Sequence, residues 1–144
     1  MKIKIQISPD IEEPYAIIYS NTMTEEIQEI ADKLNSSQNV ITAIDNEQIV
    51  ILEPTDIYML RMENDQLIVY CKQKRYLSNK RLYEMEKILG NNFMRISKST
   101  IINLKKISCV EPSFNGTMLI LLKNGSKDYI SRKYLPKFKK YLGL

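Results

Sequence analysis

The sequence predicts a mostly β, basic domain over residues 47–144 with one or two short helices, preceded by a small acidic α/β element over residues 1–46. Three observations lead to this prediction. Short apolar runs separated by turn residues follow one another after residue 47. The clearest helical spacing lies before residue 35. The formal net charge is −6 over residues 1–50 and +10 over residues 51–144, so the two parts differ in charge as well as in pattern.

The composition indicates an ordinary globular protein. At 144 residues, with 44% hydrophobic and 26% charged residues, the chain is long enough for one compact domain with an appendage. No apolar run reaches the roughly 20 residues that a membrane-spanning helix needs. The first residues alternate polar and apolar side chains, unlike the core of a signal peptide. We therefore expect a cytoplasmic protein.

The chain contains no histidine and two cysteines. Without imidazole it can build neither a Ser-His-Asp triad nor a histidine-ligated zinc site. Cys71 and Cys109 lie far apart in apolar runs, which favours two free buried thiols over a disulfide or a thiolate metal site. We expect no cofactor, no metal, no small-molecule substrate and no enzymatic activity.

The N-terminal element is predicted to combine strands with one helix. Residues 2–8 alternate isoleucine with polar residues, the period of a half-buried strand. Residues 15–19 form an apolar run that fits either a strand or the start of a helix. A helix is expected over residues 24–34, with Thr24 as its N-cap and acidic residues in its first turn. Its apolar face consists of Ile27, Ile30, Ala31 and Leu34.

The following residues alternate short strands with turns. Strands are expected over residues 40–44, 48–52, 57–62, 67–71 and 76–77. Ser78 is predicted to cap a short helix over residues 79–89, which ends at Gly90. The apolar face of this helix consists of Leu82, Met85, Ile88 and Leu89.

Residues 93–103, F-M-R-I-S-K-S-T-I-I-N, place two strand-like pieces around a compact polar stretch. Further strands are expected over residues 107–110, 118–122 and 127–130. Asn-Gly pairs at 115–116 and 124–125 separate them, and such pairs indicate type I′ hairpins because both central residues need a positive φ. A basic amphipathic helix with Pro136 in its first turn is expected at the C-terminus. Its inward side chains are predicted to be Tyr134, Leu135, Phe138, Tyr141 and Leu142.

The distribution of basic residues bears on DNA binding. A DNA reader needs cations and hydroxyls for phosphates, and a few side chains on rigid supports for base edges. The clearest helix of this chain is acidic, whereas the basic residues lie on predicted strands and loops. We therefore expect any DNA contact to come from loops and turns of the β domain.

The segment F-M-R-I-S-K-S-T-I-I-N-L-K-K-I at residues 93–107, followed by N-G-S-K-D-Y-I-S-R-K-Y at residues 124–134, resembles the LytTR family of bacterial DNA-binding domains. That family has an F-x-R-x-x-x-S-x-x-V-N-x-x-x-I segment and, after a hairpin, a strand that ends in Ser-Arg. The resemblance extends over residues 47–142. It implies an elongated β fold that inserts loops into successive major grooves at promoter repeats. The expected function is that of a stand-alone transcriptional regulator without a receiver domain.

The resemblance implies base contacts from three loops. Lys98 stands where the family has a DNA-contacting polar or basic residue, and Arg132 matches the arginine after the last strand. The third loop departs from the family because it offers no basic or imidazole donor, although Asn64 or Gln66 could pair with adenine. From the residues alone, the less favoured alternatives are that Lys98 is a solvated turn lysine and that Arg132 pairs with an acidic neighbour such as Asp128.

A second group of residues is predicted to contact phosphates or to supply a general positive field. The hydroxyls of Ser97 and Ser99 either touch phosphate or cap the turn, and both alternatives stay open. Asn103 is expected to be structural, its amide satisfying backbone groups of a turn. The predicted DNA backbone contacts are Ser97, Ser99, Lys105, Lys106, Lys123, Lys127 and Lys133.

Other classes of function compete with this interpretation. A protein-interaction or RNA-binding module needs no sequence-specific DNA readout, although few aromatic residues can be assigned to a stacking platform. A catalytic pair of Ser97 and Lys98 has poor geometry, since adjacent strand residues point to opposite faces. The expected partners are double-stranded DNA and a second copy of the chain, with residues 1–46 mediating dimerisation. Some stand-alone members of the family are held in check by a membrane protein, which is a further candidate partner.

Overall fold

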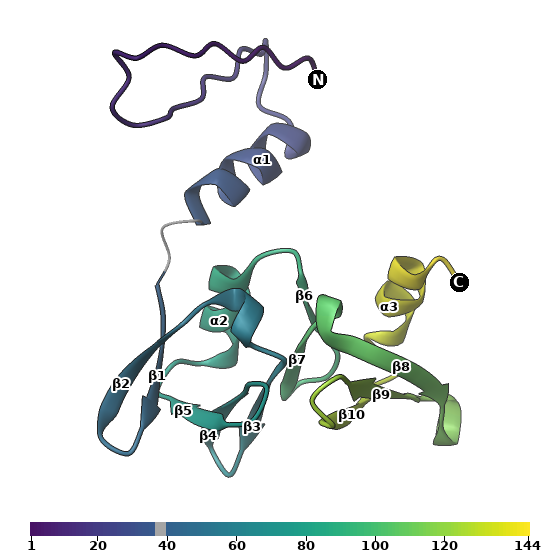
Figure 1. Cartoon of the computed structure of the whole chain (residues 1–144). Coiled ribbons are helices and arrows are strands. Elements are labelled where there is room, and N and C mark those ends of the chain that lie inside the picture. The colour runs from purple at the N-terminus through teal and green to yellow at the C-terminus, as the bar shows by residue number, and fades with distance from the viewer. Residues whose placement is uncertain (37–39) are drawn as a thin grey trace. The chain divides into compact units, whose positions relative to one another are not determined.

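The computed structural model of the chain describes residues 1–36 and 40–144, and it divides into two compact units, Met1–Leu34 and Asn35–Leu144 (Figure 1). The first unit is built on the helix α1 (Glu25–Ser36). Thr24 caps this helix, because its Oγ1 accepts a hydrogen bond from the Ile27 backbone N–H at 3.3 Å. The predicted helix and its N-cap are confirmed.

The strand predicted over residues 2–8 is wrong, and residues 15–19 form neither a strand nor the start of a helix. Ile3, Ile5 and Ile7 are exposed, with Ile7 92% accessible. A strand is stable only when its backbone groups pair with a neighbouring strand. The first unit offers no such neighbour, so the alternating pattern alone does not produce a strand.

The second unit consists of two antiparallel sheets. The larger sheet has seven strands in the order β2-β1-β5-β4-β3-β7-β6. These strands are β1 (Ile41–Asp45), β2 (Gln48–Leu52), β3 (Met59–Glu63), β4 (Gln66–Tyr70), β5 (Arg75–Ser78), β6 (Phe93–Arg95) and β7 (Thr100–Asn103). The smaller sheet has the order β10-β9-β8, with β8 (Ile107–Pro112), β9 (Met118–Leu122) and β10 (Lys127–Ile130). Two helices, α2 (Leu82–Leu89) and α3 (Leu135–Leu142), complete the unit, and the predicted mostly β class is confirmed.

The strand β1 belongs to the larger sheet. It pairs with β2 through a two-residue turn and with β5 at the register Ile44↔Leu77. The boundary expected between residues 46 and 47 therefore falls inside the β1–β2 hairpin, and the compact second unit begins at Asn35.

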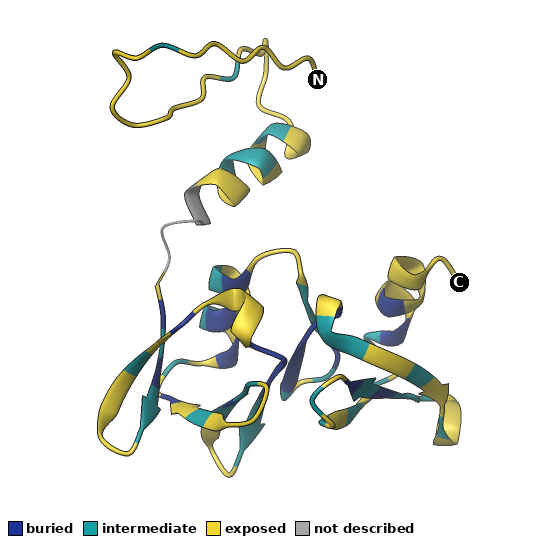
Figure 2. Ribbon diagram, in the orientation of Figure 1, coloured by how far each residue is buried: buried dark blue, intermediate teal, exposed yellow. Residues whose placement is uncertain are grey.

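Two apolar cores hold the second unit together (Figure 2). One core places α2 against the larger sheet and contains Leu60 and Ile101. The other joins the smaller sheet and α3 to the larger sheet and contains Met59 and Ile102. Alternate residues of β3 and β7 thus point into different cores. Met59 and Leu60 of β3, like Ile101 and Ile102 of β7, are therefore buried although they lie on opposite faces of the sheet.

Two local predictions need correction. Ser78 does not cap α2, because it ends β5 and its Oγ accepts a hydrogen bond from the Lys80 N–H, whereas the helix begins at Leu82. In the β9–β10 hairpin only Gly125 has a positive φ, so the turn is not type I′. The Asn124 side chain instead binds the Cys71 carbonyl and the Ser126 N–H, which fixes a longer loop.

Two predictions of burial also fail. Cys109 is exposed and Cys71 is half-buried, and both thiols are free as expected. Burial, with a smaller contribution from Asp56, raises the pKa of the Cys71 thiol to about 11. In α3, Phe138 is fully buried, whereas Tyr141 and Leu142 are exposed. Only the first turn of this short helix, with Leu135 and Phe138, is buried in the core.

Candidate nucleic-acid interface

The loop Ser97–Ser99 connects β6 to β7 and follows Ile96, which lies in the apolar core that joins the two sheets. Ile96 is fully buried on one side of it, and its N–H donates to the Thr100 carbonyl at 3.0 Å. Within the loop, the Ser97 hydroxyl oxygen accepts the Ser99 N–H at 3.2 Å and lies 3.3 Å from the Ser99 hydroxyl. Ser97 therefore caps the turn, and the Lys98 side chain is left exposed at its tip.

Arg95 holds this loop in place through backbone carbonyls, a role that the sequence did not predict. Its guanidinium donates to the backbone carbonyls of Ser97 and Lys98, the first at 3.1 Å. The same group pairs with the Glu86 carboxylate on α2 at 3.2 Å. The signal in the sequence was the arginine of the F-x-R pattern, which indicates a position but not its contacts.

The segment Ser131–Lys133 lies directly beside this loop. The Ser131 N–H donates to the Ile96 carbonyl at 2.9 Å, which joins the end of β10 to the start of the Ser97–Ser99 loop. Arg132 is exposed, and its Nε donates to the Asn115 carbonyl at 2.7 Å. It does not pair with Asp128, so that alternative for Arg132 is not realised.

The turn between β3 and β4 is the third loop at this end of the second unit. Asn64 and Asp65 have φ values of 49° and 63°, which gives the two-residue turn the backbone of a type I′ hairpin. The Met62 N–H donates to the Ser99 carbonyl at 2.8 Å, so this hairpin runs alongside the Ser97–Ser99 loop. We call the combined surface of Asn64–Gln66, Ser97–Ser99 and Ser131–Lys133 the three-loop end.

The structure thus brings together the predicted base contacts Asn64, Gln66, Lys98 and Arg132, all of which are exposed. It places the predicted phosphate contacts Ser97, Ser99 and Lys133 in the same three-loop end. Lys133 lies with its Nζ 5.6 Å from the centre of the Tyr134 ring.

The other predicted phosphate contacts lie at the opposite end of the strands. Asn103 N–H binds the Tyr58 carbonyl, and Lys123 N–H binds the Lys106 carbonyl. Both hydrogen bonds therefore lie near Met59, at the start of β3. Glu63, at the other end of β3, is four residues away, which is about 13 Å along a strand. Lys127 pairs with Leu121 near the β9–β10 turn, on the same side. The predicted phosphate contacts that lie outside the three-loop end are Lys105, Lys106, Lys123 and Lys127.

Asn103 is structural, as predicted. It is 3% exposed, its Nδ2 donates to the Ile57 carbonyl at 2.8 Å, and its Oδ1 accepts the Lys105 N–H at 3.0 Å. Both ends of the amide are therefore used to join β7 to the segment before β3. The side chain is not available to DNA.

A polar network supports the β3–β4 turn. The Glu63 carboxylate accepts hydrogen bonds from the Arg61 guanidinium and the Tyr70 hydroxyl. Burial by itself would raise the pKa of Glu63, but these hydrogen bonds outweigh burial and hold the pKa below its ordinary value of 4.5. For Arg61, burial opposes the charged form, and the contacts with Glu63 and Tyr70 raise its pKa. Glu63 therefore stays ionised and bound to Arg61 instead of repelling a polyanion as a free charge.

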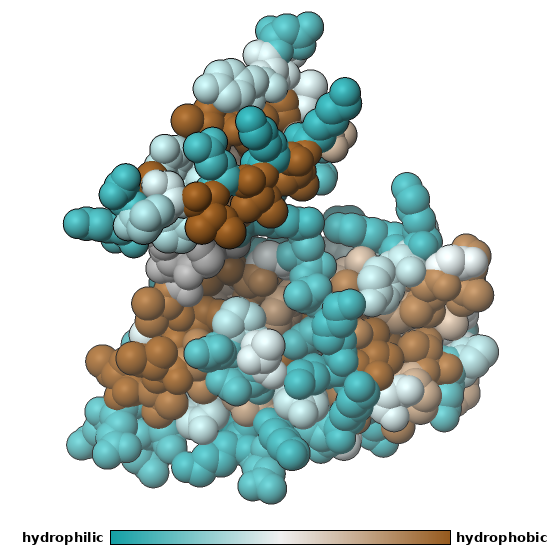
Figure 3. Space-filling model, turned by 45° about the horizontal axis from the view of Figure 1, so that its top comes forward, coloured by the Kyte–Doolittle hydropathy of each residue, from teal (hydrophilic) through white to brown (hydrophobic). Residues whose placement is uncertain are grey.

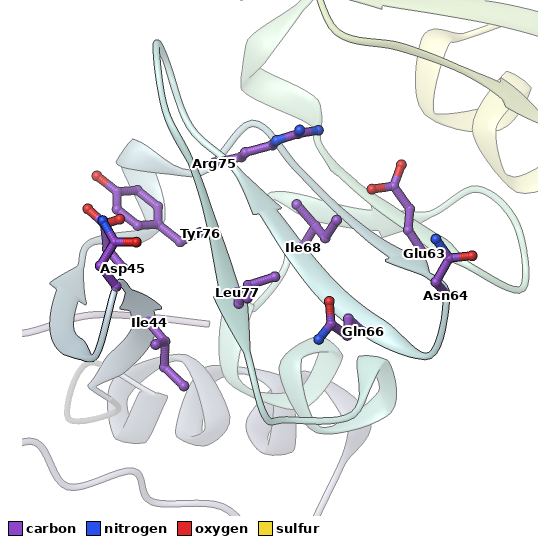
Figure 4. Close-up of a pocket in the computed structure, with 10 residues that line it drawn as sticks. Ile44, Asp45, Glu63, Asn64, Gln66, Ile68, Arg75, Tyr76 and Leu77 are labelled. Carbon is purple, nitrogen blue, oxygen red and sulfur yellow. The ribbon is translucent and has the colours of Figure 1, made fainter.

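Asn64 and Gln66 also line an open pocket on the outer face of β1, β5 and β4 (Figure 4). Arg75 and Glu63 line the same pocket, together with apolar side chains such as Ile68. On the face seen in Figure 3, hydrophilic side chains cover much of the second unit, and hydrophobic ones gather over the β1–β2 hairpin. Ile49 and Ile51 of β2 are exposed there.

Among residues 1–36 and 40–144, no group of three or more histidine, cysteine, aspartate or glutamate side chains could hold a metal ion. None of the helices that the structure describes is long and apolar enough to cross a membrane. The three-loop end presents three cations, Lys98, Arg132 and Lys133, and two amides, Asn64 and Gln66, on supports fixed by backbone hydrogen bonds.

Comparisons with known proteins agree with this description. The family model of the LytTr DNA-binding domain matches residues 47–143. A Staphylococcus aureus chain named as an HTH-type transcriptional regulator is 31% identical over 147 residues, covering 100% of this chain and 99% of the relative. The sensory transduction protein LytT of Enterococcus faecalis is 32% identical over 126 residues, covering 87% of this chain and 52% of the relative. This chain therefore spans about half the length of the enterococcal protein.

Among solved structures, a LytTr DNA-binding domain from Bacillus cereus matches with a TM-score of 0.69 at 23% identity, covering 74% of this chain and 99% of that one. At this identity the likeness shows the fold. The described helices α1, α2 and α3 are separated from one another by strands, so a helix-turn-helix is not what positions the three-loop end.

Proposed function

Because the chain belongs to the LytTR family of DNA-binding domains, we propose that it is a transcriptional regulator that reads promoter repeats through its three-loop end. The family is one of DNA-binding domains and not of enzymes. The observation that supports the proposal most directly is the hydrogen bond from the Ser131 N–H to the Ile96 carbonyl at 2.9 Å. It ties the loop of Lys98 to the loop of Arg132, although 34 positions separate the two residues in the sequence.

In this proposal Lys98 and Arg132 contact base edges in the major groove, where arginine and lysine pair with guanine. Asn64 and Gln66 supply amides for adenine. Lys133 and the hydroxyls of Ser97 and Ser99 contact the flanking phosphates. The lysines at the opposite end contribute a general positive field, because the strand register places them away from the three-loop end.

The first experiment is selection of bound duplexes from a random pool, followed by fluorescence anisotropy on the recovered site. Arg132→Ala and Lys98→Ala should each cost about 1–3 kcal/mol on the selected site and relax specificity there. Lys123→Ala is the matched control, because it removes a lysine from the opposite end and should affect all duplexes alike. Equal loss on selected and scrambled duplexes from Arg132→Ala would refute base reading by that residue.

A salt titration tests the phosphate contacts. The logarithm of the association constant should fall with the logarithm of the salt concentration, with a slope of about −0.9 for each phosphate contacted. A complex that is insensitive to salt would point to a protein-interaction module instead.

We also propose that the chain acts as a homodimer on repeated sites, in the cytoplasm, where promoter DNA lies. Residues 1–34 form a separate unit and are the candidate dimerisation element. Sedimentation of the full chain and of a chain lacking residues 1–34, which keeps β1 in its sheet, tests this role. Identical monomers in the two samples would remove it. A membrane-protein inhibitor remains a hypothesis to be tested by co-purification from membranes.

A further inference from the structure

Asp128 makes contacts with both sheets of the second unit. It lies on β10 of the smaller sheet, and its Oδ2 accepts a hydrogen bond from Thr100 Oγ1 of β7 at 2.7 Å. The same Oδ2 lies 3.5 Å from Arg61 Nη1 of β3. Its Oδ1 accepts the Tyr129 N–H at 2.7 Å. One carboxylate therefore links β3, β7 and β10.

Each of these three strands directly precedes or follows one loop of the three-loop end. Thr100 directly follows the Ser97–Ser99 loop, and Asp128 stands three residues before Ser131. Arg61 pairs with Thr100 in register and also binds Glu63, beside the β3–β4 turn. Asp128 consequently connects the strands that adjoin the three loops.

Thr100, Asp128 and Arg61 are largely shielded from water, so their contacts with one another are not easily replaced by contacts with solvent. Thr100 is fully buried, so its hydroxyl has no water with which to replace Asp128. The Asp128 and Arg61 side chains are 21% and 28% exposed. Both oxygens of Asp128 already accept hydrogen bonds within the protein, and phosphate repels a carboxylate, so Asp128 supports the loops and does not itself touch DNA.

We propose that Asp128 is a positioning residue that fixes the spacing between Lys98 and Arg132, and thereby sets the specificity of DNA readout. This inference rests on the proposed function, because it needs both residues to read bases. Rigid support of contact groups by a second layer of hydrogen bonds is what keeps such groups within the narrow geometry that recognition requires.

The substitution Asp128→Asn tests the inference through the sign of its effect. Asparagine keeps the size of the side chain and removes its charge, which weakens the link to Arg61. Removing an acidic group near a polyanion should by itself raise the affinity for every duplex. Positioning predicts the opposite for the selected site: affinity should fall about tenfold there, while affinity for scrambled duplexes stays the same or rises. A rise on both duplexes would overturn the proposal.

A second pair of variants separates positioning from a general loss of stability. Thr100→Ser keeps the hydroxyl that Asp128 binds and should keep the ratio of selected to scrambled affinity. Thr100→Val removes that hydroxyl and should lower the ratio. All affinities are measured well below the melting midpoint of each variant, recorded by circular dichroism. Equal ratios for Thr100→Ser and Thr100→Val would also overturn the proposal, and this pair decides the matter if Asp128→Asn does not fold.

The outcomes distinguish this inference from the function on which it rests. If Lys98→Ala and Arg132→Ala reduce the ratio and Asp128→Asn does not, the positioning role fails and the proposed function stands. If neither Lys98→Ala nor Arg132→Ala changes the ratio, base reading by these residues fails first.

Discussion

Replacing Arg95 with glutamine removes the group that holds the Ser97–Ser99 loop. The guanidinium donates to the carbonyls of Ser97 and Lys98, and hydrogen bonds to charged groups contribute about 1.5–3 kcal/mol each when both partners are shielded. The Arg95 side chain is 23% exposed, and water can replace part of what is lost. The ion pair with Glu86, which is 49% exposed, contributes less than about 1 kcal/mol.

These magnitudes give an expected loss of about 1–2 kcal/mol in the free energy of unfolding. The free protein would also have to order the loosened tip of the loop on binding, and ordering one residue, Lys98, costs about 1–2 kcal/mol. We therefore expect affinity for the selected duplex to fall about 5- to 30-fold. Urea denaturation measures the first quantity, and fluorescence anisotropy measures the second.

Arg81→Gln serves as the matched control, since Arg81 is an exposed arginine at the start of α2 and belongs to no loop of the three-loop end. It should change neither the stability nor the affinity by more than about 0.5 kcal/mol. If Arg95→Gln behaves like this control in both assays, the reasoning about the loop is wrong.

Three further predictions concern stability. Asn103→Ala should lower the free energy of unfolding by about 2–4 kcal/mol, measured with urea, because the buried Ile57 carbonyl and the Lys105 N–H lose their partner; a loss below about 0.5 kcal/mol would contradict the role assigned to this amide. The lowered pKa of Glu63 means that the folded protein favours the carboxylate more than the unfolded chain does, so its contribution is complete above pH 4.5 and is lost as the pH falls through the lower folded pKa. Glu63→Gln should therefore flatten the fall in urea midpoint on acidification, and an unchanged slope would argue against it. Phe138→Ala should cost about 3–5 kcal/mol, since the ring is fully buried between α3 and the smaller sheet; a thermal midpoint equal to that of the parent protein would refute this packing.

The elements that the sequence predicts well are those with strong local patterns. The face of Ile27, Ile30 and Ala31 identified α1, and the Asn115-Gly116 turn correctly separated β8 from β9. The alternation at residues 2–8 is equally regular but has no strand to pair with. Periodicity can be read from one segment, whereas a stable strand also needs a second strand to which its backbone groups can bind.

The candidate site was predictable to a similar extent. Lys98 and Arg132 could be located through the family resemblance, and both are exposed in neighbouring loops. The roles of Arg95 and Asp128 could not, because they depend on contacts across sheets that no local pattern encodes. Sequence alone also grouped Lys123 with the interface, although the strand register places it at the opposite end.

The central claim is that DNA binds at the three-loop end, and NMR titration of the isotope-labelled full chain with the selected duplex tests it most directly. The account predicts that the largest shifts of backbone amide signals occur at Asn64, Lys98 and Arg132, with small shifts at Lys105, Lys123 and Gly125. Largest shifts at Lys105, Lys123 and Gly125, with the three-loop end unchanged, would contradict it.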